Sequence, residues 1–186
     1  MNGHSLVMGQ LTDFVTGTVL PDTHDERYRQ KIARWLVMEK GYTPTNLKPH
    51  LLEIRIAGKY ARIPVAWTVW EGMRLIMIVH YGPGSLVTRH RPALAMSRLA
   101  APYQVPVVVV TNGETAEILD GGSGRITAAG FDGIPAASEI ADRIRDHRWE
   151  AIAPERIELE QRILMAFEVD DRCPCDDTIC RIEAPR

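Results

Sequence analysis

The chain of 186 residues has few cysteines, no long apolar run and no large surplus of either charge. All its cysteines lie close to the C-terminus, so disulfides cannot form the framework of the fold. No stretch approaches the roughly eighteen apolar residues that a membrane-spanning helix needs. The first ten residues also lack the basic and apolar regions of a signal peptide. We therefore expect a cytoplasmic protein that does not enter a membrane.

The balance of charge excludes a globally basic nucleic-acid-binding protein. Lysine and arginine number 22 against 24 acidic residues, which gives a formal net charge of −2. A hydrophobic content of 45% is ordinary for a globular protein. A chain of this length forms one domain with a real core and buries roughly 70% of its unfolded surface. Any contact with nucleic acid must therefore come from a local patch.

The spacing of apolar residues predicts an α/β fold. A helix is expected over 23–40, because Thr23 and Glu26 have the spacing of a capping box and Gly41 suits the position after a helix end. Strands are expected over 50–57, 63–70 and 73–80. A helix over 88–101, with Pro92 in its first turn, and a strand over 105–110 complete a right-handed βαβ unit.

The C-terminal part of the chain predicts further elements on the same domain. Residues 116–120 and 125–129 flank a glycine-rich turn and are expected to pair as a hairpin at the edge of the sheet. Helices are expected over 136–145 and 154–167, followed by an irregular tail. The domain proper is assigned to residues 1–135. Residues 136–186 supply C-terminal helices and a cysteine-bearing tail that pack on it.

Several short motifs resemble one known family. They are Asp-Glu-Arg-x-Arg-Gln at 25–30, Gly-Tyr at 41–42, Pro-Gly after the third strand and Val-x-Val-Val-Thr-Asn-Gly at 107–113. Together with the order of elements over about 11–125, they resemble the N-terminal domain of the type I restriction enzyme R subunit. The resemblance implies a PD-(D/E)xK nuclease fold, which is a restriction-endonuclease-like mixed central sheet flanked by helices. The extra helices and the cysteine tail would follow it.

In that family an Asp at the end of the second strand and Glu-x-Lys on the third hold a divalent metal and activate water. The hairpin over 62–81 matches this place but lacks the acids. The Asp position falls within 64–66, near Ala66, and the Glu-x-Lys falls near Val79 and Tyr81 or one residue earlier. Only Glu26 on the first helix remains of the family's acids. The resemblance therefore implies that the ancestral hydrolysis is lost.

Two residues near this hairpin are candidates for a catalytic role. His80 could replace the missing Lys as a proton acceptor, or it could be a buried histidine at a strand end. Glu26 could be the remaining metal ligand or only the carboxylate of the capping box. An active alternative is an endonuclease with a migrated Mg²⁺ site that uses Glu26, His80 and an acid such as Glu53.

The segment 82–91 is the candidate for nucleic-acid binding. It follows a parallel strand and precedes a helix, where ligands of open α/β sheets usually lie. Hydroxyl groups, cations and free N–H groups at a helix start can all contact phosphate in DNA or RNA. An arginine-rich helix end can also be an ordinary solvated face. The candidate residues are Ser85, Thr88, Arg89, Arg91 and, further along the helix, Arg98.

The cysteines form the pattern C-x-C-x4-C at Cys173, Cys175 and Cys180. Three thiolates within one loop suit Zn²⁺ or an iron–sulfur cluster, with a fourth ligand from His147, an aspartate, solvent or another chain. The other interpretation is reduced thiols on a tail that binds no metal.

These observations favour a stand-alone, catalytically degenerate module that binds nucleic acid or serves assembly. An active metal-dependent endonuclease and a metal-binding module built on the tail are the alternatives. The sequence leaves open a homodimer through apolar strand edges.

Overall fold

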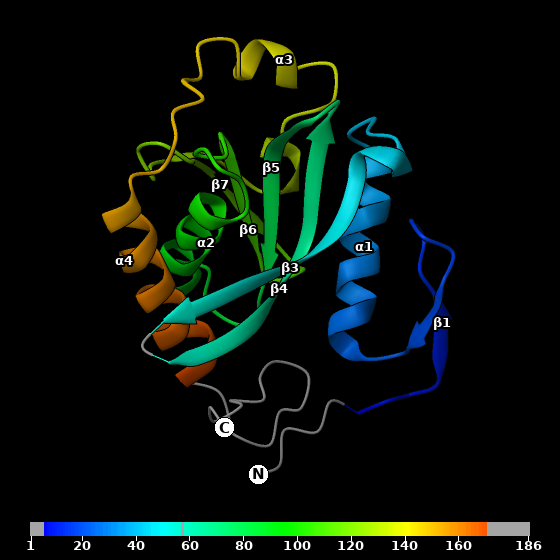
Figure 1. Ribbon diagram of the computed structural model, residues 1–186. Coiled ribbons are helices and arrows are strands. Elements are labelled where there is room, and N and C mark those ends of the chain that lie inside the picture. Colours follow the sequence, from blue (N-terminus) through cyan, green and yellow to red (C-terminus); the bar gives the residue numbers. More distant parts are fainter. Residues whose placement is uncertain (1–5, 57, 171–186) are drawn as a thin grey trace.

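A computed structural model of the protein describes residues 6–56 and 58–170. It contains a two-stranded hairpin and a six-stranded mixed sheet flanked by helices (Figure 1). The strands are β1 (Gln10–Thr12), β2 (Val19–Pro21), β3 (Leu47–Ile56), β4 (Lys59–Glu71), β5 (Arg74–Tyr81), β6 (Val107–Thr111), β7 (Ala116–Asp120) and β8 (Ile126–Ala129). The helices are α1 (His24–Met38), α2 (Val87–Leu99), α3 (Ile140–Arg143) and α4 (Pro154–Leu164). Short 3₁₀ turns cover Pro44–Asn46 and Phe131–Gly133, and a π-helical turn covers Met165–Asp170.

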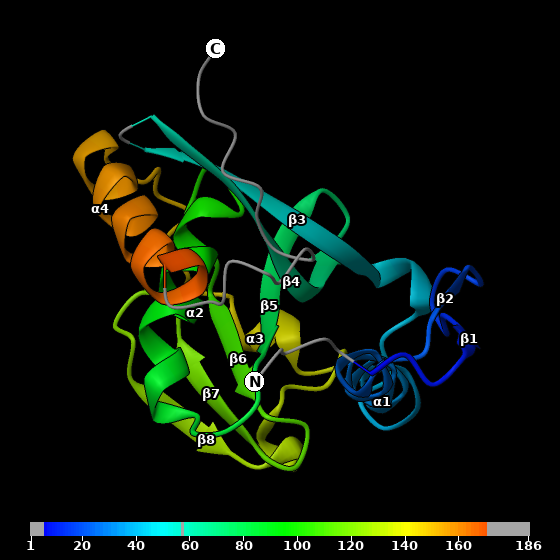
Figure 2. The ribbon, with the colours of Figure 1, turned by 90° about the horizontal axis from the view of Figure 1, so that it is seen from below.

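The main sheet has the order β3-β4-β5-β6-β7-β8, in which only β5 and β6 are parallel. Helix α1 covers one face, and residues of α3 join the same core; we call this the α1 face. Helices α2 and α4 cover the other face, which we call the α2 face. Figure 2 shows α1 and α4 on opposite sides of the sheet. The predicted α/β class and the βαβ unit are confirmed.

The central strands β5 and β6 are buried on both faces. Every residue from Leu75 to His80 and from Val107 to Thr111 is buried. Their side chains alternate between the two cores, as in Val108 toward α2 and Val109 toward α1. Runs of this kind need helices on both faces, which explains the crossover through α2.

A β-bulge in β4 changes which residues face which core. Lys48 pairs with Thr68, but His50 pairs with Val65, so β4 has one residue more than β3 over this interval. Val65 therefore lies in the core of the α2 face, whereas Trp67, two residues later, lies in the core of the α1 face. The bulge brings a tryptophan to the α1 face.

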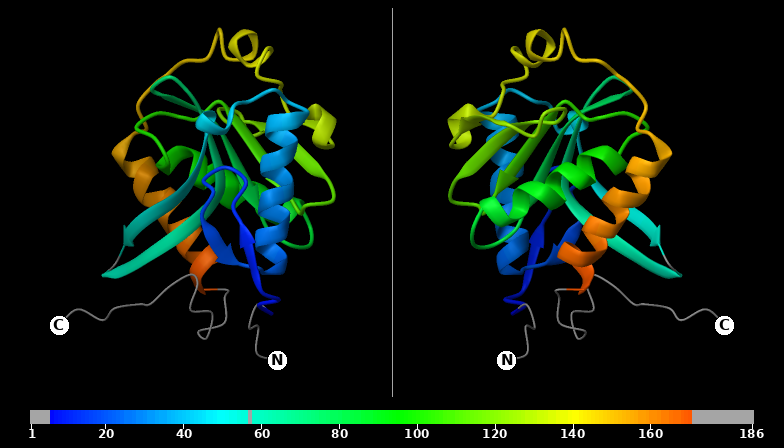
Figure 3. Two further views of the ribbon diagram at one scale, coloured as in Figure 1. Left: turned by 90° about the vertical axis from the view of Figure 1, so that its right-hand side faces the viewer. Right: turned by 90° about the vertical axis from the view of Figure 1, so that its left-hand side faces the viewer.

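Several predicted boundaries need correction. The helix expected over 136–145 is only the four-residue α3, because a series of turns occupies most of that segment. Pro92 lies inside α2 and not in its first turn, since the helix begins at Val87. Strand β3 begins at Leu47 and includes Pro49, which an edge strand tolerates. The β1–β2 hairpin was not predicted; it lies beside α1 (Figure 3).

The start of α1 confirms half of the predicted capping box. Thr23 is the N-cap, and its Oγ1 accepts a hydrogen bond from Glu26 N at 3.1 Å. The carboxylate of Glu26 turns to Arg29 and Gln30. The cap thus positions Glu26, but its carboxylate accepts hydrogen bonds from Arg29 and Gln30 instead of completing the capping box.

Helix α4 is held to α2 by one buried carboxylate. Glu160 is fully buried, and its oxygens lie 2.6 Å from Arg91 Nη1, 2.9 Å from Arg98 Nη1 and 2.5 Å from Arg156 Nε. Burial alone would raise the pKa of Glu160, but the hydrogen bonds and charges of these arginines lower it. The C-terminal helix is therefore attached through a charge network as well as through apolar packing. In the described part of the chain, no helix combines the length and apolarity that a membrane crossing requires.

We predict that Glu160→Gln lowers the free energy of unfolding by about 3 kcal/mol, because it leaves the arginines without a counter-charge. Urea denaturation at pH 7 measures this. Since the pKa of Glu160 is lowered by folding, its contribution is present above the ordinary glutamate pKa and is lost as the pH falls through the folded value. Glu158→Gln is the matched control, because Glu158 makes an exposed ion pair with Arg162 on the same helix. Equal losses in the two variants would contradict the prediction.

Candidate functional site

Four polar side chains gather beside the first turns of α1. Arg29 Nη2 lies 2.7 Å from Glu26 Oε1 and also pairs with Asp13, which the turn after β1 supplies. Gln30 Nε2 donates to Glu26 Oε1 at 2.7 Å and to Asp13 Oδ2 at 3.0 Å. Asp13 is buried, and its other oxygen accepts hydrogen bonds from the N–H groups of Val15 and Thr16. Both carboxylates therefore have the same guanidinium as their counter-charge.

Trp67 fixes the position of this arginine from the sheet side. Its ring lies 4.4 Å from Arg29 Cζ, a cation–π contact, and its Nε1 donates to the Arg29 carbonyl oxygen at 2.9 Å. Trp67 is fully buried and reaches α1 because of the bulge in β4. Arg29 is thus held between an aromatic ring and two carboxylates. Burial alone would lower the pKa of Arg29, but the hydrogen bonds and charges of Glu26 and Asp13 raise it.

The positions that the resemblance assigns to the missing acids lie on this same face. Ala66, Val79 and Tyr81 all pack against the core beneath α1. Tyr81 Oη donates to Asp25 Oδ1 at 3.1 Å, and its ring stacks on Tyr28 at 5.6 Å between centroids. Burial and the Asp25 carboxylate raise the pKa of Tyr81, so its phenol stays neutral at physiological pH.

The site does not suit the divalent metal that the resemblance implies. Hard cations such as Mg²⁺ need several oxygen ligands, and neither Ala66 nor Val79 offers one. Both oxygens of Glu26 and Oδ2 of Asp13 are already hydrogen-bonded to Arg29, whose positive charge opposes a second cation, and Oδ1 of Asp13 is bonded to backbone N–H groups. Over residues 6–56 and 58–170, no group of three or more His, Cys, Asp or Glu side chains converges to hold a metal ion. Cys173, Cys175 and Cys180 lie outside the described residues.

His80 lies on the opposite face of the sheet from Glu26. It is buried between Val79 and Tyr81 in β5, and its Nε2 lies 3.6 Å from Glu168 Oε1 in the π-helical turn. Arg89 Nη1 approaches the same carboxylate oxygen at 3.6 Å. The structure therefore does not bring His80 and Glu26 together.

Glu53, the third member of the alternative nuclease site, is remote from both. It is exposed on β3, where Arg62 Nε of β4 donates to it at 3.0 Å. The β3–β4 hairpin extends away from the centre of the sheet (Figure 3). The three residues of that alternative site thus belong to separate parts of the fold.

The segment 82–91, which was predicted to bind nucleic acid, follows β5 and leads into α2 as expected, but its arginines point inward. Arg91 and Arg98 bind Glu160 of α4, and Arg89 faces Glu168. Glycine at position 82 leaves room for the Arg89 side chain, since a Cβ there would lie 3.0 Å from Arg89 Nε. Carboxylates more than sixty positions later in the chain thus engage the arginines that the sequence offers as phosphate contacts.

The start of α2 remains open to solvent. Ser85 and Thr88 are exposed, and Thr88 Oγ1 donates to the Ser85 carbonyl oxygen at 3.0 Å. Leu86 is the N-cap residue, and an apolar side chain cannot accept a hydrogen bond from the first turn. That turn also contains no acidic residue. The partial positive charge of the helix N-terminus is therefore not countered by its own first turn.

Sequence reasoning missed the residues that define the α1-side cluster. Asp13 and Trp67 were not singled out, and Arg29 and Gln30 entered only as part of the motif at 25–30, without a role in a site. The spacing of Arg29 three positions after Glu26 was a usable signal for an ion pair on a helix. The approach of Asp13 and Trp67 had no local signal, because it depends on the packing of two strands against α1.

We predict that Asp13→Asn lowers the free energy of unfolding by about 2 kcal/mol at pH 7. Burial alone would raise the pKa of Asp13, but hydrogen bonds from Thr16 and Gln30 and the charge of Arg29 lower it from 3.8 to about 2. The wild type should lose this increment as the pH falls from about 3.8 toward 2, and the variant should not.

Urea denaturation across this pH range measures the difference between the two proteins. Asp142→Asn is the control, because Asp142 forms an exposed ion pair with Arg145. Parallel acid profiles for wild type and Asp13→Asn would contradict the assignment.

Comparison with known proteins identifies the family. Comparison with curated proteins found no match, and comparison with solved structures found none. The family model described as the type I restriction enzyme R protein N terminus matches residues 24–135, from the first residue of α1 to the segment after β8. This match covers more than half of the chain and includes the whole main sheet. The protein therefore belongs to the family of type I restriction enzyme R protein N-terminal domains.

Proposed function

We propose that this protein is a non-cleaving, PD-(D/E)xK-like member of its family that binds nucleic-acid backbone. The observation that carries the loss of cleavage is the Arg29 guanidinium between Asp13 and Glu26. It supplies the positive charge that a metal would bring, but it cannot activate water as a metal does. Ala66 and Val79 in place of acids agree with this interpretation.

The start of α2 supports the binding part of the proposal. Exposed Ser85 and Thr88 lie beside a helix N-terminus whose first turn bears no acid. Backbone N–H groups and hydroxyls at such a place suit a phosphate oxygen. Arg89 is a quarter exposed and leaves part of its side chain at this surface. Because few cations are available, we expect weak binding that depends on few phosphates and shows little base preference.

The cleavage prediction concerns the complete chain with supercoiled plasmid and Mg²⁺ or Mn²⁺. We expect no cleavage above a protein-free control, because the metal ligands are absent and Glu26 is bound by Arg29. Calorimetry should likewise show no tight divalent-cation site near Glu26. Metal-dependent cleavage that Glu26→Gln abolishes, while Glu39→Gln at the end of the same helix retains it, would reject the proposal.

The binding prediction uses fluorescence anisotropy with short single-stranded and double-stranded DNA and RNA at low salt. Thr88→Glu should weaken binding at least several-fold, because a carboxylate in the first turn of α2 repels phosphate. Met73→Glu adds the same charge at the exposed turn before β5 and should leave affinity almost unchanged. Failure of the wild type to bind any of these nucleic acids would reject this part of the proposal and favour a role in assembly.

A further inference from the structure

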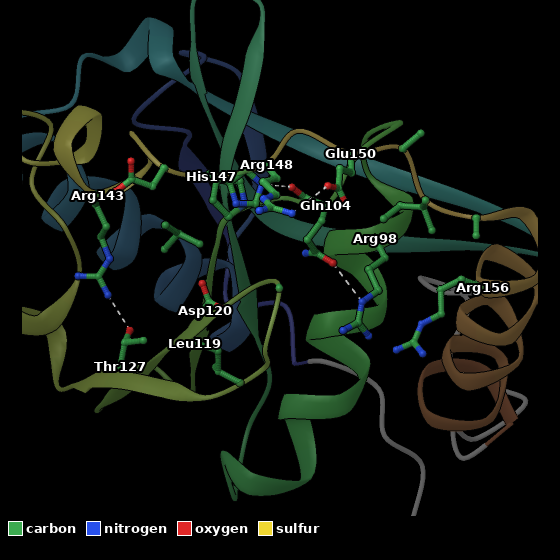
Figure 4. Close-up of a pocket in the computed structure, with 17 residues that line it drawn as sticks. Arg98, Gln104, Leu119, Asp120, Thr127, Arg143, His147, Arg148, Glu150 and Arg156 are labelled. Carbon is green, nitrogen blue, oxygen red and sulfur yellow. Dashed lines mark hydrogen bonds and ion pairs between the residues drawn. The ribbon is translucent and has the colours of Figure 1, made fainter.

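A second feature lies at the other end of the central strands. The segment 82–91 follows the end of β5, whereas a cavity of about 660 Å³ lies at the start of β6 and the end of β7. The end of α2, the start of α4 and the segment between α3 and α4 form its other walls (Figure 4). A cavity of this size is within the range of small-molecule sites. Nothing in the proposed function uses it.

The cavity contains part of an uneven charge cluster. Within the described part of the chain, three arginines meet the single carboxylate of Glu160, so two positive charges remain in excess. Two of these arginines, Arg98 and Arg156, line the cavity, and Figure 4 shows their side chains close together there. Burial lowers the pKa of Arg98, and the neighbouring Arg156 and Arg91 lower it further against the effect of Glu160. An anion placed beside Arg98 and Arg156 would relieve this repulsion.

The wall around Arg98 is rigidly built. Arg98 Nε donates to Gln104 Oε1 at 3.0 Å, and Gln104 Nε2 donates to Ser97 Oγ at 2.9 Å and to the Val105 carbonyl oxygen at 2.8 Å. His147 Nε2 lies 2.8 Å from the Gln104 carbonyl oxygen. The side chain of Arg98 is only 12% exposed, so it has little conformational freedom left to lose when a ligand binds.

The rest of the cavity differs in chemistry from the part around Arg98 and Arg156. Pro106, Val107 and Leu119 give it an apolar part. Asp120, Asp146 and Glu150 add acceptor oxygens, and Arg143 and Arg148 lie in the same part, with Arg148 Nη1 3.8 Å from Glu150 Oε1. Because this part carries acids and arginines together, it suits a neutral hydrogen-bonding group, so a small molecule with one anionic end and a hydrogen-bonding end would match both parts.

We propose that this cavity binds a small phosphate-bearing molecule of about mononucleotide size, with the phosphate at Arg98 and Arg156. Arginine pairs bind phosphate through charge-assisted, often bidentate hydrogen bonds. The donor groups of the ligand face the acidic residues, and its planar or apolar part lies on the surface near Leu119. This proposal is independent of nucleic-acid binding at the start of α2.

The test measures calorimetric binding of three probes to the complete chain: inorganic phosphate, adenosine 5′-monophosphate and adenosine. We expect the monophosphate to bind more tightly than phosphate, and adenosine to bind much more weakly than its monophosphate. Arg156→Gln should weaken monophosphate binding about tenfold, which corresponds to the loss of one charge-assisted contact. Equal affinity for adenosine and its monophosphate, or binding of none of the probes at millimolar concentration, would overturn the proposal.

The matched control is Arg91→Gln. Arg91 binds the same carboxylate, Glu160, but is not among the described residues that line the cavity. Both variants should lose similar stability, and only Arg156→Gln should lose affinity. Equal affinity losses in the two variants would reject the site.

A measurement on the wild type keeps the test valid if a variant fails to fold. Amide resonances of residues around Gln104, His147 and Ala153 should shift when adenosine 5′-monophosphate is added. Shifts confined to residues 82–91 would place the phosphate at the start of α2 and overturn the proposal. A lack of shifts near the cavity would do the same.

Discussion

The parallel pairing of β5 and β6 is the constraint on which the rest of the structure depends. Both strands are buried on both faces, and Met77 to Tyr81 pair in register with Val107 to Thr111. A parallel pair requires a crossover, which α2 provides, and two apolar faces require a cover on each side. Helix α1 supplies one cover, while α2 and α4 supply the other.

Each cover brings a charged network to the edge of an apolar core. On the α1 face, Arg29 pairs with both Asp13 and Glu26, and on the α2 face three arginines surround Glu160. Buried charges cost free energy unless they are paired, and in both networks the buried carboxylates accept hydrogen bonds from arginine. The first network has more acid than base and the second more base than acid. The excess of arginine explains why we expect an anion beside the second network. At the first, we expect no metal because the carboxylate oxygens already accept hydrogen bonds and the charge of Arg29 opposes a second cation.

Local signals predicted the elements that local interactions stabilise. Thr23 marks the start of α1, whose end at Met38 comes two residues before the predicted one, and the β-branched run before Asn112 is β6. The β1–β2 hairpin was missed because strands of three residues carry too little pattern. The segment 136–145 was predicted as one helix, yet only Ile140–Arg143 is helical, between turns, and the segment places Ile140 and Ile144 in the α1-side core. Tertiary packing decided these cases against local propensity.

By itself, the sequence determined the α/β class, the crossover unit and the absence of acids at 66, 79 and 81, because side-chain type and period are local properties. Only the tertiary structure decided where the charges go. Arg91 and Arg98 find Glu160 across more than sixty residues, and a bulge in β4 turns Trp67 toward Arg29. Such contacts have no local period, since they arise when packed helices bring distant residues together. For the same reason the arginines that a linear reading assigns to nucleic acid serve the fold first.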